Sequence, residues 1–143
     1  MNGFINRKLI AAGTILFFMG LITGFVIPLF ENPRMGLSGH LEGVMNGIFL
    51  IALGAAWGNI ILSIRLQTIA FWLLVYGAFA NWLFVLAAAI FGTSEMTPIA
   101  GSGYSGLPWQ ETLVNVGLMS VGVAMVMGTV ILVIGFVRNS ESS

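Results

Sequence analysis

The chain has 143 residues, of which 58% are hydrophobic and only 7% are charged, and its formal net charge is zero. A soluble domain carries about 25% charged residues, so this composition excludes a globular protein with a fully polar surface. The chain contains no cysteine, which excludes disulfides, zinc–thiolate sites and iron–sulfur clusters, and it has no basic run for nucleic acid.

Four apolar runs follow one another along the chain, at residues 9–30, 41–63, 66–91 and 112–137. Each reaches the ~20 residues that a helix needs to cross a bilayer, and none alternates as the strands of a membrane barrel do. The prediction is an all-α integral membrane protein, a single domain of residues 1–143 built as a bundle of four transmembrane helices. The first run is too long for the apolar part of a signal peptide, so we expect it to be retained.

The few cations predict the orientation of these helices. Arg7, Lys8, Arg65 and Arg138 would fall on one side of the membrane and Arg34 on the other. Cytoplasmic loops carry the excess of Lys and Arg, so we expect both termini in the cytoplasm of a bacterial cell, with the chain in its inner membrane.

The segment 32–47 holds an unusual concentration of polar residues, with the sequence NPRMGLSGHLEGVMNG. The only histidine, His40, stands at the mouth of the second apolar run, and Glu42 and Asn46 follow within two helical turns. Polar groups in hydrocarbon surroundings are costly unless they are paired or used.

On a helix, His40 would lie above Gly43 and Gly47, because positions three, four and seven apart share a face. A flat macrocycle such as haem fits against such a groove, with the imidazole on its iron. The alternative interpretation is that His40 caps the start of the helix. The glycines, for their part, also suit close packing between helices.

Four further polar residues have two interpretations each. Glu42 either accepts a proton or favours the helix dipole from the first turn. Asn81, in the middle of the third run, either binds a substrate or hydrogen-bonds between helices. Glu111 and Asn115 begin the fourth run on the same side as His40, where they either join the polar cluster or, for Glu111, cap the helix.

Residues 92–111 form a connection longer than is usual in a compact domain, and they contain Tyr104 and Trp109. The segment returns to the same side of the membrane as His40. It is either a lid over a site there or an exposed loop with an interfacial tryptophan.

Three blocks resemble the hydroxylaminobenzene mutase family: segment 32–47, segment 76–82 (YGAFANW) and the ends of segment 98–111 (PIA and PWQE). The resemblance implies a small membrane isomerase that converts hydroxylaminobenzene to 2-aminophenol by an intramolecular hydroxyl shift without net redox change. The chain is more distantly similar to styrene oxide isomerase, through His40 and the pair Asn46-Gly47.

This second resemblance implies a trimer with ferric haem b held by His40 and with Asn46 near the substrate oxygen. A third-helix tyrosine of that enzyme has no counterpart, because Phe84 and Val85 stand near its position and Tyr76 lies two turns earlier. The tyrosine's role is therefore not carried over.

Together these patterns predict that haem b, bound by His40 with Gly43 and Gly47 beneath it, acts as a Lewis acid on a small aromatic substrate. Asn46, Asn81 and Glu42 are the predicted catalytic residues. The predicted pocket also includes Tyr76, Tyr104, Glu111 and Asn115. Two alternatives remain open: a haem-binding redox or sensor subunit, and a proton-coupled exporter of aromatic compounds that uses Glu42.

Overall fold

The computed structural model describes residues 2–140, and its regular structure in this range is entirely helical. The long helices are α1 (Asn2–Val26), α2 (Pro33–Ala56), α3 (Ile64–Phe91) and α4 (Pro108–Ser140). Short 3-10 turns, η1 (Ile27–Leu29) and η2 (Trp57–Asn59), follow α1 and α2. Four helices are long and apolar enough to span a membrane, which confirms the predicted all-α membrane fold.

Local sequence signals set the ends of two of these helices. Asn32 caps α2: its side-chain oxygen accepts a hydrogen bond of 3.2 Å from the backbone N–H of Met35. Pro33 takes the first helical position, where its missing N–H has no consequence. Gly92 ends α3 in the left-handed conformation, with φ of 64°.

The observed boundaries correct the sequence ranges at the second helix. α2 begins at Pro33 rather than at residue 41, so His40 and Glu42 lie well inside the helix. The interpretations of His40 as a helix cap and of Glu42 as a first-turn acid are therefore wrong. Hydropathy missed this start because residues 31–40 are polar, although Asn32 and Pro33 carry the cap signal. α4 likewise begins earlier, at Pro108.

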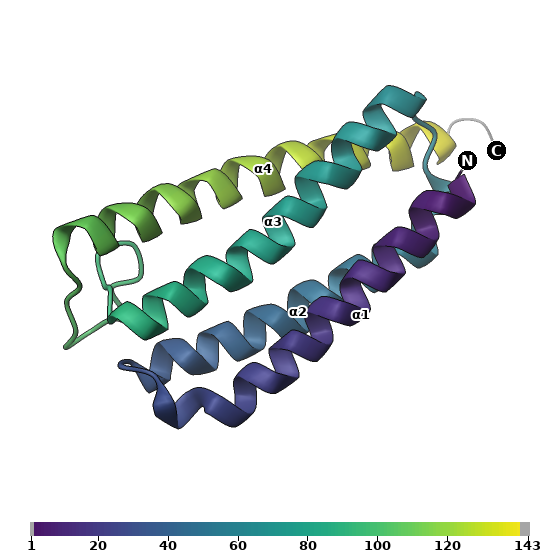
Figure 1. Cartoon of the computed structure of the whole chain (residues 1–143). Helices are drawn as coiled ribbons and strands as arrows, with labels where there is room; N and C mark the ends of the chain where they lie inside the picture. Colours follow the sequence, from purple (N-terminus) through teal and green to yellow (C-terminus); the bar gives the residue numbers. More distant parts are fainter. Residues whose placement is uncertain (1, 141–143) are drawn as a thin grey trace.

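Figure 1 shows the long helices side by side in the order α4, α3, α2 and α1, with both termini at one end. α1 and α2 form the most extensive pair, α2 also packs on α3, and α4 packs along α3. The bundle is therefore open, because α4 has a neighbour on one side only.

Glycine contacts bring α1 and α2 together. A Cβ atom added at Gly13, Gly20, Gly43 or Gly47 would lie 2.5–2.6 Å from backbone atoms of the opposite helix. Such distances leave no room for a side chain, so the two backbones touch directly along this seam.

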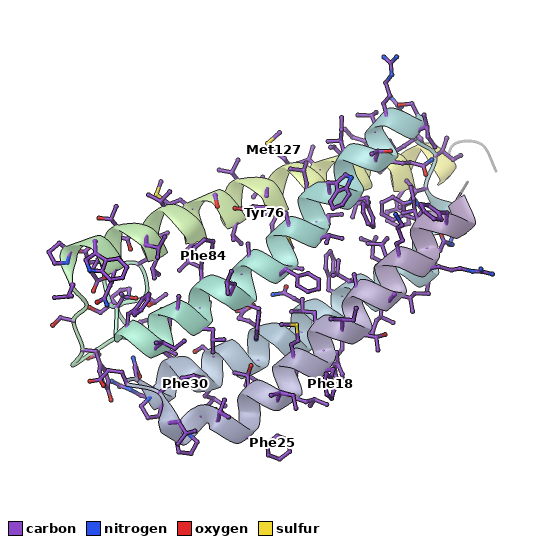
Figure 2. All side chains as sticks on the ribbon, in the orientation of Figure 1. Phe18, Phe25, Phe30, Tyr76, Phe84 and Met127 are labelled. Carbon is purple, nitrogen blue, oxygen red and sulfur yellow. The ribbon has the colours of Figure 1, made fainter. Side chains whose placement is uncertain are left out.

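Large apolar side chains cover the outside of the chain. Figure 2 shows Phe18 and Phe25 projecting away from α1 and Met127 away from α4. Phe25 is 83% exposed, and in α1 only 22% of the most apolar window is buried inside the chain. Lipid or further subunits must cover this surface.

Candidate active site

His40 lies in the seam between α2 and α1. Its Nδ1 atom is 2.8 Å from the carbonyl oxygen of Gly20, and the ring lies against Gly24, where an added Cβ would meet Nδ1 at 2.9 Å. A carbonyl oxygen only accepts hydrogen bonds, so Nδ1 carries the proton and donates it to Gly20. In the neutral imidazole, the other nitrogen, Nε2, then carries the lone pair.

This arrangement fits a histidine that ligates a metal, because ligating histidines usually donate their second ring N–H to a carbonyl or carboxylate. Within the described residues, Nε2 has no hydrogen-bond partner and is not sealed inside the chain. His40 is therefore oriented from α1 and open at the atom that would bind iron. No group of three or more metal-ligating His, Asp or Glu side chains occurs in the described part of the chain.

Gly43 and Gly47 do not form the open groove that was predicted to hold haem. An added Cβ at Gly43 would meet the Cα of Gly20 at 2.5 Å, and one at Gly47 would meet the backbone of Phe17 at 2.6 Å. Helix α1 fills the groove over Gly43 and Gly47, so a haem held by His40 would lie outside this groove. The structure supports the packing interpretation of these two glycines.

A second polar cluster joins α2 to α3. The side-chain amide of Asn46 donates a 3.1 Å hydrogen bond to Oε2 of Glu42, and the amide of Asn81 donates a 2.6 Å bond to the same oxygen. All three residues are half-buried within membrane-spanning helices. The three predicted catalytic residues thus form one connected group.

His40 and this cluster lie on different faces of α2. At 3.6 residues per turn, positions 40 and 42 are about 200° apart around the helix axis. His40 accordingly contacts Gly20 of α1, whereas Glu42 contacts Asn81 of α3. Within one chain the histidine and the amides do not converge on a common point.

Trp82 links α3 to α1 beside the cluster. Its indole Nε1 donates a 3.2 Å hydrogen bond to the hydroxyl oxygen of Thr23, and its ring lies 2.9 Å from a Cβ placed at Gly43. Both residues line an apolar groove of about 290 Å³ between α1 and α3. Sequence analysis did not predict this pair. The threonine inside an apolar helix was the signal for a polar partner.

The remaining pocket candidates lie away from the cluster. Tyr76 shares a 2.6 Å hydrogen bond with Ser120 of α4, and Figure 2 shows it on the α4 side of α3. Asn115 donates a 2.7 Å hydrogen bond to Glu95 in the loop. The guanidinium group of Arg34 lies over the ring of Tyr104, with its Cζ atom 5.9 Å from the ring centre.

Glu111 organises the long loop rather than joining the amides. Its carboxylate accepts hydrogen bonds of 2.9–3.2 Å from the backbone N–H groups of Ser94, Glu95 and Gly106. Only 5% of Glu111 is exposed.

The start of α2 holds the same loop from the other side. Asn32 donates a 2.9 Å hydrogen bond to the carbonyl of Ala100, and Arg34 donates one to the carbonyl of Ser102. The loop is therefore tied down at both edges, while Ile99 within it and Trp109 after it remain exposed.

Comparison with known proteins identifies the family to which the chain belongs. A family model described as styrene oxide isomerase matches residues 5–137. The chain belongs to the styrene oxide isomerase family. Among curated proteins, hydroxylaminobenzene mutase HabB of Ectopseudomonas oleovorans is 46% identical over 120 residues, covering 83% of this chain and 73% of the relative.

Hydroxylaminobenzene mutase HabA of the same organism is 43% identical over 131 residues, covering 91% of this chain and 97% of the relative. No solved structure matches the chain. Membership of the styrene oxide isomerase family, with mutases as relatives, makes the protein a membrane isomerase.

Proposed function

We propose that this isomerase acts on arylhydroxylamines and converts hydroxylaminobenzene-type substrates to 2-aminophenols. The observation that carries the proposal is the convergence of two amides on one carboxylate, Asn46 and Asn81 on Glu42, inside membrane-spanning helices. Polar groups at such a depth are typical of functional sites. The names of the two relatives, both hydroxylaminobenzene mutases, support the same substrate class.

The proposed reaction is a rearrangement without net oxidation or reduction. The N–O bond of the substrate breaks, and a C–O bond forms at the ortho carbon of its ring. One proton moves from that carbon to the nitrogen, so the atoms and electrons of substrate and product balance.

The chain's own residues hold the substrate and move this proton. Asn46 and Asn81 bind the polar end of the arylhydroxylamine, and the aromatic ring lies against apolar side chains. Oε1 of Glu42, the carboxylate oxygen that the amides leave free, takes the proton from the ring carbon and returns it to nitrogen. Apolar surroundings exclude water, so the hydroxyl group returns to the same molecule.

Haem b, in the ferric state, is the proposed cofactor, and His40 is the residue that would hold it, through Nε2. The Gly20 carbonyl supports this assignment because it fixes the ring and its tautomer. When bound, ferric haem would supply a Lewis acid that polarises the N–O bond.

The proposed active form is a homotrimer in which the His40 face of one chain meets the amide cluster of the next. The separation of these groups around α2 supports a site shared between chains. Co-expression of His40→Ala and Asn46→Leu chains tests it, because mixed trimers would contain one intact site and regain activity. Two variants that stay inactive together would contradict a shared site.

Both termini are proposed to face the cytoplasm of a bacterial cell, with the site toward the outer half of the inner membrane. The distribution of Arg7, Lys8, Arg65 and Arg138 against Arg34 supports this orientation. Reporter fusions at the C-terminus test it: a reporter active only in the cytoplasm should be active, and a periplasmic one silent.

The cofactor and the reaction are tested together on protein purified in nanodiscs. Wild-type protein should show a Soret band and form 2-aminophenol, and His40→Ala should lose both. Gly122→Ala is a matched control, because nothing lies within 4 Å of the added methyl group. Full activity in a haem-free preparation would contradict the cofactor proposal and leave an acid–base mechanism built on Glu42.

A further inference from the structure

We propose that Glu42 is also a positioning residue that sets the hydrogen-bond polarity of the site. It holds the amino groups of Asn46 and Asn81, so their carbonyl oxygens remain for the substrate, and the site selects aromatic compounds with an N–H or O–H donor over epoxides. This inference deepens the proposed function and rests on it for the identity of the site.

The orientation of both amides follows from their shared partner. Each amide turns its amino group toward Oε2 of Glu42, which accepts both hydrogen bonds. The Oδ1 atoms of Asn46 and Asn81 are thereby turned away from the carboxylate. An amide side chain at position 42 can donate as well as accept, so it would not impose this choice.

Three acceptor oxygens of the cluster have no partner among the described residues: Oε1 of Glu42 and the Oδ1 atoms of Asn46 and Asn81. None of the three is sealed inside the chain, whereas sealed and unpaired atoms occur elsewhere, for example at Thr93. In a membrane interior no water is at hand to satisfy such oxygens. A ligand that brings donors would satisfy them.

Arylhydroxylamines and epoxides, the two substrate classes of this family, differ in whether they carry a hydrogen-bond donor. An arylhydroxylamine carries one N–H and one O–H donor, and an epoxide carries acceptors alone. A site built to bind a donor rejects an analogue that lacks it, because the acceptors of the site are left unpaired.

Binding of two inert probes tests the inference without requiring turnover. Benzyl alcohol has an O–H donor and benzyl methyl ether has none, and the two share the same ring. Dissociation constants are measured by ligand-detected NMR in nanodiscs for wild type, Glu42→Gln and Glu42→Ala. Partition of the probes into lipid is the same for every variant, so the change in the alcohol-to-ether ratio reports the site.

We expect wild type to prefer the alcohol by about 10-fold, as for a ligand whose missing donor leaves a buried acceptor unpaired. The preference should fall below about 3-fold in both variants, because the amides can then rotate. Glu95→Gln is a matched control, since Glu95 binds Asn115 outside the cluster, and it should keep the wild-type ratio. An unchanged ratio in Glu42→Gln, or no preference in wild type, would overturn the inference.

A second readout uses wild-type protein alone and guards against a variant that does not fold. The side-chain amide NMR signals of Asn46 and Asn81 should each show one strongly downfield proton, bonded to the carboxylate. Benzyl alcohol should shift these signals and the ether should not. If both probes act alike, the inference fails even where the rearrangement of hydroxylaminobenzene is observed. A clear alcohol preference without rearrangement would leave the inference standing and remove the proposed substrate.

Discussion

The carbonyl oxygen of Gly20 lies 2.8 Å from Nδ1 of His40, and this contact fixes the only histidine of the chain from a neighbouring helix. The ring is thereby held in one orientation, with Nε2 open. The glycine seam between α1 and α2 makes the contact possible, because a side chain at Gly20 would push the helices apart.

Gly24→Ala should weaken the proposed binding of haem while leaving the fold intact. The new methyl group would lie 2.9 Å from Nδ1 of His40, so the ring must shift and its bond to Gly20 lengthens. Loss of such an orienting bond lowers metal affinity by about 10-fold or more. Haem retention, followed by the Soret band during transfer to apomyoglobin, measures this. Retention equal to that of Gly122→Ala would contradict it.

Gly43→Ala should lower the thermal stability of the whole protein. Its Cβ would meet the Cα of Gly20 at 2.5 Å, and backbone cannot move aside as a side chain can. Overpacking of this kind costs about 1–3 kcal/mol, or roughly 3–10 °C in melting temperature for a chain of this size. Circular dichroism during heating gives the midpoint. A midpoint within error of the Gly122→Ala control would contradict the close backbone contact between Gly43 and Gly20.

Asn81→Leu should remove most of the turnover without unfolding the chain. The substitution conserves shape and deletes the 2.6 Å hydrogen bond to Glu42. We expect kcat/KM for hydroxylaminobenzene to fall about 100-fold, as for loss of a group that assists proton transfer. Asn59→Leu, an exposed asparagine at the opposite end of α2, serves as the control. Equal activities of the two variants would exclude Asn81 from the site.

Tyr76→Phe should have little effect on activity. The hydroxyl group of Tyr76 bonds Ser120 of α4, not the amide cluster. Its loss should cost about 0.5–1.5 kcal/mol of stability, with kcat/KM unchanged within a factor of three or so. A double-mutant cycle with Ser120→Ala measures the coupling. A large loss of kcat/KM would instead place this tyrosine at the substrate.

Glu111→Gln should loosen the loop that connects α3 to α4. The carboxylate accepts bonds from the backbone of Ser94, Glu95 and Gly106, and an amide oxygen cannot replace both of its oxygens. Hydrogen exchange across residues 93–107 should become faster. Glu31→Gln, an exposed carboxylate at the same end of the molecule, provides the comparison. Unchanged exchange would mean that Asn32 and Arg34 suffice to hold the loop.

Much of the fold could be predicted from the sequence, because apolar length alone identifies membrane helices. The pairing of Glu42 with Asn46 also follows from their spacing of four. What fills the face with Gly43 and Gly47 could not be predicted, since the periodicity of one helix does not identify its neighbour. The partner of Asn81 could not be predicted from the sequence for the same reason.

Glu111 shows a second limit of sequence reasoning. Its spacing from Asn115 predicts a shared helical face, yet its carboxylate turns back to the loop, where unpaired backbone N–H groups attract it. Such a contact depends on loop geometry, which sequence patterns describe poorly.

The most direct test of the central claim follows the oxygen atom of the substrate. Purified wild-type protein in nanodiscs is incubated with hydroxylaminobenzene in oxygen-18 water, and the product is analysed by mass spectrometry. An intramolecular shift in a water-free site predicts 2-aminophenol without the heavy isotope. Asn81→Leu should form this product about 100-fold more slowly. Absence of 2-aminophenol, or its formation with oxygen from the solvent, would contradict the claim.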